Sequence, residues 1–282
     1  MRGEIHLVLA TLLAGIGWIA SKLVITGIPG DLFIATRFLI ASFILLPFCY
    51  KSVFRLSLQQ VLSVCGVGLM LTVGIQVWIY AVSITNSLSE GAFIMSLAMI
   101  IAPFTAWIFF REKPNRAFWI ALPIAVVGMM LLTLANGWQV ESSQWCFLLS
   151  SALFSVHFIF NKRVVTNTVK PLVSIYLQLL TVGCVSFIYV LLTQEIEYQL
   201  NNTVIFWFIV STLIATSIRY LFQSVGQFSV KIETAALIMI LEPIWTLLLS
   251  ISMLGEEVKL QKLLGAAVIF LSLFVYVKLS RR

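Results

Sequence analysis

The composition of this chain excludes a water-soluble globular protein. Of its 282 residues, 61% are hydrophobic and only 10% are charged, whereas a soluble domain carries roughly 25% charged residues. The formal net charge of +7 does not come from one basic patch, because Lys and Arg lie in short segments between apolar runs. That pattern is typical of membrane topology, and we therefore expect no nucleic-acid partner.

Runs of apolar residues bounded by Gly, Pro or charge predict an all-α integral membrane protein with ten transmembrane helices. A spanning helix uses about 20 mostly apolar residues, and such helices satisfy their own backbone polar groups in lipid. The first run resembles a signal sequence, but no small-residue cleavage site follows it, so we expect an uncleaved helix. The expected spans are 5–25, 32–48, 58–84, 87–110, 117–134, 145–160, 171–193, 204–226, 232–254 and 260–279.

The distribution of basic residues predicts the orientation in the membrane. With the N-terminus in the cytoplasm, most of the 18 Lys and Arg residues fall in inner segments, and only Lys259 and Lys262 fall in outer loops. Cytoplasmic loops of membrane proteins are enriched in Lys and Arg. We therefore expect both termini in the cytoplasm and a multi-pass protein of the bacterial inner membrane.

Two halves of the chain resemble each other at an offset near 140 residues. Pro103 corresponds to Pro243, and Glu90 corresponds to Glu233 if a short gap is allowed. Chance similarity between apolar sequences is the alternative explanation. A true repeat would give two domains, 1–136 and 137–282, of five spans each, and since five is odd the second would be inverted. Inverted repeats are a recurring plan of secondary transporters.

Spans one, two and nine carry the motifs WIASK at 18–22, ATRFL at 35–39, LEPI at 241–244 and MLGE at 253–256. With these motifs the chain resembles the EamA-like family of the drug/metabolite transporter superfamily over nearly its whole length. The resemblance implies a ten-helix inverted-repeat fold and export of amino acids or other metabolites without ATP. One departure is that Pro103 precedes Glu112 by nine residues, whereas Pro243 precedes Glu256 by 13. We therefore expect the end of span four to be about one turn short.

Polar and ionisable side chains inside the spans are the candidates for chemistry. Such a charge costs about 2.5–3.5 kcal/mol on insertion scales, so it tends to face a cavity or a partner. The expected depths place these residues in two layers. The outer layer contains Lys22, Arg37 and Gln76 with Glu90 at the mouth, and the inner layer contains His157, Gln178, Arg219 and Glu242.

Arg219 and Glu242 have similar expected depths and could therefore meet. A buried pair that braces spans eight and nine is one interpretation, and a pair that opens with substrate or a coupled proton is the other. Glu242 precedes Pro243, which removes a backbone hydrogen bond, so Pro243 is a candidate hinge or helix break. Pro103 has the same candidate role in span four.

The other candidates also have two interpretations each. Lys22 could extend to the outer interface, or it could join Arg37 in attracting an anionic group such as a substrate carboxylate. His157 could be a packing residue or a proton relay. Gln76 could bridge helices or bind a ligand. The sequence favours no single choice for Gln76.

Aromatic side chains complete the candidate substrate pathway. Most aromatics in membrane helices pack or lie at interfaces, but those near a central cavity could accept an apolar or cationic substrate. The candidates for the pathway are Trp18, Lys22, Arg37, Gln76, Trp78, Tyr80, His157, Arg219, Tyr220, Glu242 and Trp245.

Motifs that would indicate an enzyme or a pump are missing from the sequence. There is no P-loop, no G-x-S-x-G elbow and no HExxH. The cysteines Cys49, Cys65, Cys146 and Cys184 lie singly in or beside apolar runs, which favours packing roles over disulfides or metal ligation. We therefore expect no enzymatic activity, no cofactor and no metal.

Together these features predict a secondary transporter that exports an amino acid or related small metabolite by alternating access. An importer or exchanger of a nucleotide-related metabolite is the first alternative, and a lipid-handling membrane protein is the second. The expected partners are the substrate, the lipid bilayer and a coupled proton. The small-residue run 265–267 could pack helices within a monomer or between the copies of a homodimer.

Overall fold

The computed structural model describes residues 2–133, 141–164, 169–193, 198–230, 238–239, 241–257 and 259–280. The regular elements in these ranges are α-helices and one π-helical stretch, as expected for an all-α protein. Glu233, the start of the ninth expected span and the proposed domain boundary at 136/137 lie outside the described residues.

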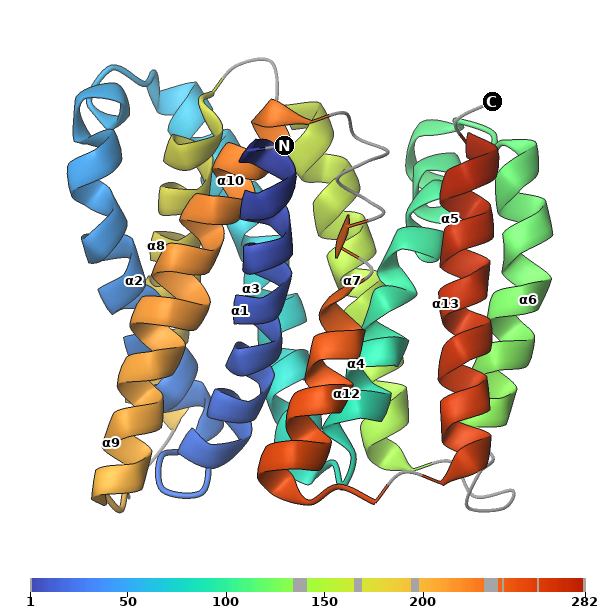
Figure 1. The fold of residues 1–282 in the computed structure, drawn as a ribbon. Coiled ribbons are helices and arrows are strands. Elements are labelled where there is room, and N and C mark those ends of the chain that lie inside the picture. Colours follow the sequence, from blue (N-terminus) through green and yellow to red (C-terminus); the bar gives the residue numbers. More distant parts are fainter. Residues whose placement is uncertain are drawn as a thin grey trace.

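The first part of the chain forms six helices along the bundle (Figure 1). Helix α3 has a complete capping box, in which Ser57 and Gln60 exchange side-chain to backbone hydrogen bonds. The bounds are α1 Arg2–Val24, α2 Gly30–Val53, α3 Leu58–Ile84, α4 Leu88–Ser96, α5 Ala98–Phe110 and α6 Arg116–Thr133.

The second part of the described chain is also helical and contains a π-helix in the middle of one span. Asn201 caps the helix that leads into it by accepting a hydrogen bond from the backbone of Val204. The bounds are α7 Ser142–Val164, α8 Pro171–Thr193, α9 Asn202–Ile209, η2 Val210–Ile218, α10 Arg219–Ser229, α12 Leu241–Leu254 and α13 Leu260–Ser280.

Helical residues occur in each of the ten expected spans. Within the described ranges, seven helices are long and apolar enough to cross a membrane, and an eighth span results if α4 and α5 are counted as one bent helix. Helices α6 and α12 contain shorter apolar stretches, Arg116–Leu131 and Leu241–Leu254. The protein is therefore a multi-pass helical membrane protein.

Helix α1 begins and helix α13 ends at the same end of the bundle, at the top of Figure 1. We call this the proximal end and the opposite end the distal end. The chain turns at the distal end between α1 and α2, between α3 and α4, and between α12 and α13 (Figure 1).

Packing between the helices depends on small residues and apolar side chains. Helix α2 lies against α8, α3 lies against α7 and α8, and α6 pairs with α13. A Cβ added to Gly183 of α8 would lie 2.7 Å from the backbone nitrogen of Leu39, and one added to Gly128 of α6 would lie 2.8 Å from that of Ile269. Close backbone approach at small residues is typical of membrane helix pairs.

The span that contains Pro103 is broken, but not at the proline itself. Helices α4 and α5 bend by 43°, and the break falls at Leu97, six residues before Pro103. A proline lacks the N–H for the preceding turn and its ring crowds that turn, which explains a break on its N-terminal side. Pro243 instead lies in the first turn of α12, within the part of this span that the structure describes. In a first turn the backbone N–H groups have no partner within the helix, so the missing N–H of a proline breaks no helical hydrogen bond.

The expected shortening of span four is present. Seven residues follow Pro103 before α5 ends, whereas eleven follow Pro243 before α12 ends. A left-handed residue comes next in both places, Arg111 with φ 56° and Gly255 with φ 65°. Both helices therefore end at a left-handed residue, and the segment after the proline is about one turn shorter in α5 than in α12.

Candidate functional site

Helix α1 approaches two helices of the second half closely because it has glycines at the contacts. A Cβ on Gly15 would lie 3.2 Å from the backbone nitrogen of Thr246 in α12. A Cβ on Gly17 would lie 3.0 Å from the Cβ of Ala215 in η2. The polar side chains of α1, α12 and η2 are thereby brought into one region of the bundle.

Glu242 of α12 accepts hydrogen bonds from α1 and from α10, the helix that follows η2. Nε1 of Trp18 donates to its Oε1 at 3.2 Å, and Nη2 of Arg219 donates to its Oε2 at 3.5 Å. The two charged side chains retain 21% and 23% exposure. The structure thus brings Arg219 and Glu242 together, as their depths in the sequence indicated.

Arg37 of α2 is almost fully buried, with 5% exposure. Its Nε donates to Oγ1 of Thr216 at 2.6 Å, and its Nη1 donates to Oγ of Ser21 at 3.0 Å. The guanidinium also lies 5.4 Å and 5.5 Å from the ring centres of Phe33 and Phe38. In the described part of the chain, Arg37 makes no ion pair.

The π-helix η2 positions Thr216 for this contact, and the sequence reasoning missed it. Thr216 and Ser217 donate their hydroxyls to the carbonyls five residues earlier, those of Ser211 and Thr212. With nine residues, η2 is long for a π-helix. π-Helices are rare overall, and those that occur are often found at functional sites. The pairs of Ser and Thr spaced five apart are the signal that could have indicated it.

These contacts join four spans through six side chains that we call the central polar cluster. Trp18 and Ser21 lie one turn apart on α1, so the Glu242 contact and the Arg37 contact are neighbours. The cluster consists of Trp18, Ser21, Arg37, Thr216, Arg219 and Glu242.

Aromatic rings surround part of the cluster. Trp78 meets Trp18 edge to face with ring centres 5.2 Å apart, and Phe147 lies 5.7 Å from Trp18. The guanidinium of Arg219 lies 5.2 Å from the ring centre of Tyr220. Of the residues expected from the sequence, Trp78 and Tyr220 therefore adjoin the cluster.

Other expected pathway residues lie elsewhere. Nε1 of Trp245 donates to Thr11 at the contact of α12 and α1, and Tyr80 is 59% exposed beside a distal groove of about 500 Å³. Gln76 donates to Ser186 and thereby bridges α3 and α8. His157 lies 2.7 Å from Gln178, in a network between α7 and α8.

Lys22 is held by backbone carbonyls at the distal end. Its Nζ donates to the carbonyl oxygens of Val82, Ser83 and Thr85 at 2.9, 3.4 and 2.6 Å. These carbonyls lie at the C-terminus of α3, where a cation also interacts favourably with the helix dipole. Lys22 therefore ties α1 to the end of α3 and does not join Arg37.

Glu256 of the MLGE motif binds the start of α4, a role that the sequence did not indicate. Its carboxylate accepts hydrogen bonds from the hydroxyls of Ser89 and Ser250 at 2.5 Å each, and from that of Ser87. Ser87 is the N-cap of α4. A carboxylate at a helix N-terminus is favoured by the unpaired N–H groups and the dipole there.

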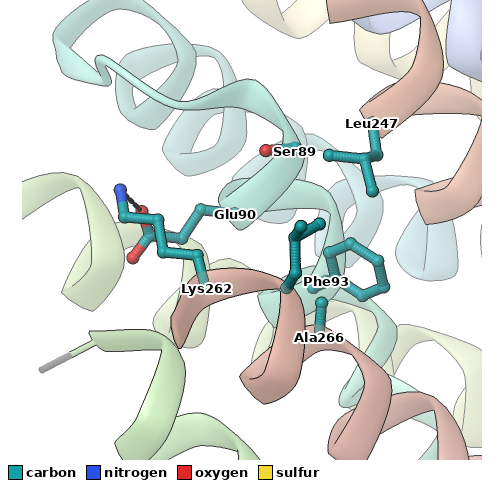
Figure 2. Close-up of a pocket in the computed structure, with 7 residues that line it drawn as sticks. Ser89, Glu90, Phe93, Leu247, Lys262 and Ala266 are labelled. Atoms are coloured by element: carbon teal, nitrogen blue, oxygen red, sulfur yellow. Dashed lines mark hydrogen bonds and ion pairs between the residues drawn. The ribbon is translucent and has the colours of Figure 1, made fainter. Parts of the chain in front are cut away.

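Glu90, in the first turn of α4, forms the second distal contact (Figure 2). Nζ of Lys262 donates to its Oε2 at 2.9 Å, and Gln144 donates to its other oxygen. Beside the pair is a cavity of about 10 Å³, room for about one water molecule. We call Ser87, Ser89, Glu90, Gln144, Ser250, Glu256 and Lys262 the distal latch.

The described residues hold no group of three His, Cys, Asp or Glu side chains that could ligate a metal ion. The four cysteines are free thiols. In the described chain, the functional side chains that cluster are therefore charged groups, hydroxyls and aromatic rings.

An apolar helical bundle with charged side chains gathered between its helices is the architecture of a membrane transport protein. The profile of the EamA-like transporter family matches the chain over residues 1–134 and 142–278, and the chain belongs to that family. The resemblance inferred from the motifs is thereby confirmed, and the protein is a transporter.

One relative and one solved structure are similar to the chain over nearly its whole length. An uncharacterized transporter of Archaeoglobus fulgidus is 23% identical over 276 residues, which are 96% of this chain and 84% of that protein. A solved crystal structure matches with a TM-score of 0.70 and 16% identity, covering 99% of this chain and 98% of that one. At this identity the likeness concerns the fold alone.

Proposed function

We propose that this protein is a secondary transporter that exports an amino acid or a related small metabolite across the bacterial inner membrane. The central polar cluster is the observation that carries this proposal. It joins α1 and α2 of the first half to η2, α10 and α12 of the second half. A site between two halves can face either side of the membrane if the halves rock against each other.

The Arg219–Glu242 contact has the properties of a pair that opens. Its 3.5 Å separation exceeds the 2.7–2.9 Å of a well-formed charged hydrogen bond. Both side chains are partly exposed, and Nε of Arg219 is buried without a hydrogen-bond partner in the described chain. A substrate group that satisfies these atoms would therefore compete with the pair.

The proposed topology has ten spans as two inverted halves, with the proximal end in the cytoplasm. The two separate matches to the family profile support the repeat. The described loops at the proximal end contain Arg55, Arg111, Lys113 and Lys170, whereas the described distal loops contain Lys259. This asymmetry supports the orientation because cytoplasmic loops are rich in Lys and Arg.

In this proposal the distal latch is the outer gate. In the first half, serines at the start of α4 bind Glu256, which follows α12 in the second half. Glu90 of α4 binds Lys262, which lies in the first turn of α13. The latch therefore joins the two halves directly. Opening toward the outside requires that these hydrogen bonds break and re-form in each cycle.

The test is counterflow in proteoliposomes with a panel of labelled amino acids and related metabolites. We expect specific uptake by the native protein and at least a tenfold loss in Glu242→Gln, because the neutral amide no longer attracts Arg219. Glu257→Gln is the matched control, since it neutralises an exposed carboxylate outside the cluster. Full uptake by a well-folded Glu242→Gln variant would make the pair a structural brace.

A further inference from the structure

The central polar cluster contains more positive than negative charge. Arg37 and Arg219 contribute two guanidinium groups, and Glu242 contributes one carboxylate. The two arginines meet the same segment, because Thr216, which accepts a hydrogen bond from Arg37, lies three residues before Arg219. The carboxylates of the distal latch, Glu90 and Glu256, bind Lys262 and serine hydroxyls. Within the described chain, one positive charge of the cluster therefore has no counter-ion.

One guanidinium group of the cluster also has a buried N–H donor without an acceptor. Nε of Arg219 is buried and has no hydrogen-bond partner in the described chain. Arg37 donates from Nε and Nη1, and no described residue accepts a hydrogen bond from its Nη2. Buried donors without acceptors are uncommon and require an explanation.

A carboxylate ligand accounts for both observations. It supplies the missing negative charge and accepts the free N–H groups, and guanidinium groups match carboxylates in geometry. A zwitterion would leave the excess charge of the cluster unchanged, whereas an anion removes it.

We propose that Arg37 and Arg219 together bind the carboxylate of the transported molecule, and that this molecule is a net organic anion without an ammonium group. This inference rests on the proposed transport function and narrows the substrate to one charge class. The remainder of the molecule lies against the aromatic rings of Trp18, Trp78 and Tyr220, which adjoin the cluster. The sequence suggested Lys22 as the second cation, and the structure assigns that role to Arg219.

The experiment compares labelled compounds that share one carbon skeleton and differ in charge. Proteoliposomes are assayed for counterflow of several 2-amino acids, the corresponding 2-oxo acids and the corresponding amines. We expect uptake of an oxo acid at least tenfold faster than uptake of its amino acid, and no uptake of the amine. Preferred uptake of amino acids or amines would overturn the inference and leave the transport function intact. No uptake of any compound would count against both.

Equilibrium binding of the preferred oxo acid to the purified full-length protein separates the roles of the charged residues. We expect Arg37→Gln to raise Kd at least tenfold and Arg37→Lys to raise it less. Glu242→Gln removes the sole negative charge of the cluster, so we expect it to bind the anion at least as tightly as the native protein, although it turns over poorly. Weaker anion binding in Glu242→Gln would contradict the inference.

A purely structural role for Arg37 would give a different result. Loss of the Thr216 and Ser21 contacts would lower the melting temperature but would leave the ratio of Kd for the oxo acid to Kd for the amino acid unchanged. If Arg37→Gln does not fold, Arg37→Lys and Glu242→Gln still measure this ratio. An unchanged ratio in both variants would refute the proposed anion site.

Discussion

Lys22 and Arg37 are both cations inside apolar helices, and the protein stabilises them in different ways. Three backbone carbonyls surround the ammonium of Lys22, whereas two hydroxyls and two aromatic rings surround the guanidinium of Arg37. The sequence placed both residues in one outer layer. It could not separate them, because the carbonyls that bind Lys22 lie 60 to 63 positions further along the chain, and Thr216, which binds Arg37, lies 179 positions away in a π-helix.

The different surroundings predict different effects of substitution. Replacement of Lys22 by Met keeps the length of the side chain but removes the cap of α3. We expect a loss of about 2 kcal/mol, since hydrogen bonds to charged groups contribute about 1.5–3 kcal/mol, and a KM for substrate within twofold of the native value. Thermal unfolding in detergent and transport kinetics measure the two quantities. A large rise in KM with unchanged stability would place Lys22 in the substrate site.

At the scale of single helices, the spacing of motif residues in the sequence predicted helix lengths correctly, but the sequence did not predict local departures from α-helical conformation. The offset between proline and glutamate correctly indicated that the end of span four is one turn short. The π-helix was not predicted, because an isolated chain favours α-helical hydrogen bonding and the extra residue is accommodated through contacts with α1 and α2. The break at Leu97 was assigned to Pro103 itself, since only the coordinates show on which side of the proline the helix bends.

The left-handed residues that end α5 and α12 give a matched pair of stability predictions. Arg111 has a Cβ at φ 56°, which costs roughly 1–2 kcal/mol relative to glycine. We therefore expect Arg111→Gly to stabilise the protein by about 1 kcal/mol. Gly255→Ala should destabilise it by a similar amount, because no atom lies within 4 Å of the new Cβ and only the backbone conformation matters. Chemical denaturation in mild detergent tests both. The same sign for the two variants would contradict this reading.

At the scale of the whole molecule, composition and the apolar runs predicted an all-helical membrane protein, and the motifs in spans one, two and nine indicated the EamA-like family. Both predictions are confirmed. The sequence also selected Trp18, Arg37, Arg219 and Glu242, which the fold brings together. The distal latch was missed, apart from Glu90, since its hydrogen bonds join residues from opposite halves of the chain. The roles of the cluster, the inverted repeat and the orientation stay predictions.

The latch predicts a local effect that can be measured without a substrate. Glu256→Ala removes the acceptor for three serine hydroxyls, and we expect the start of α4 to open more often. Hydrogen exchange followed by mass spectrometry should show at least tenfold faster exchange of the backbone amides in the first two turns of α4. Glu257→Ala is the control, because this neighbouring carboxylate is exposed. Equal exchange in both variants would mean that the latch does not hold α4.

The excess positive charge between α1, α2 and α10 also has an electrical consequence. Moving one elementary charge across a membrane potential is worth about 2.3 kcal/mol per 100 mV. In the proposed exporter, whose proximal end faces a negative cytoplasm, the voltage would draw the unloaded cluster toward the cytoplasmic side, where the cargo is collected. Once an anion has neutralised the excess charge, the loaded halves would rearrange with little sensitivity to voltage. The resting potential of the cell would then reset the empty carrier after each delivery.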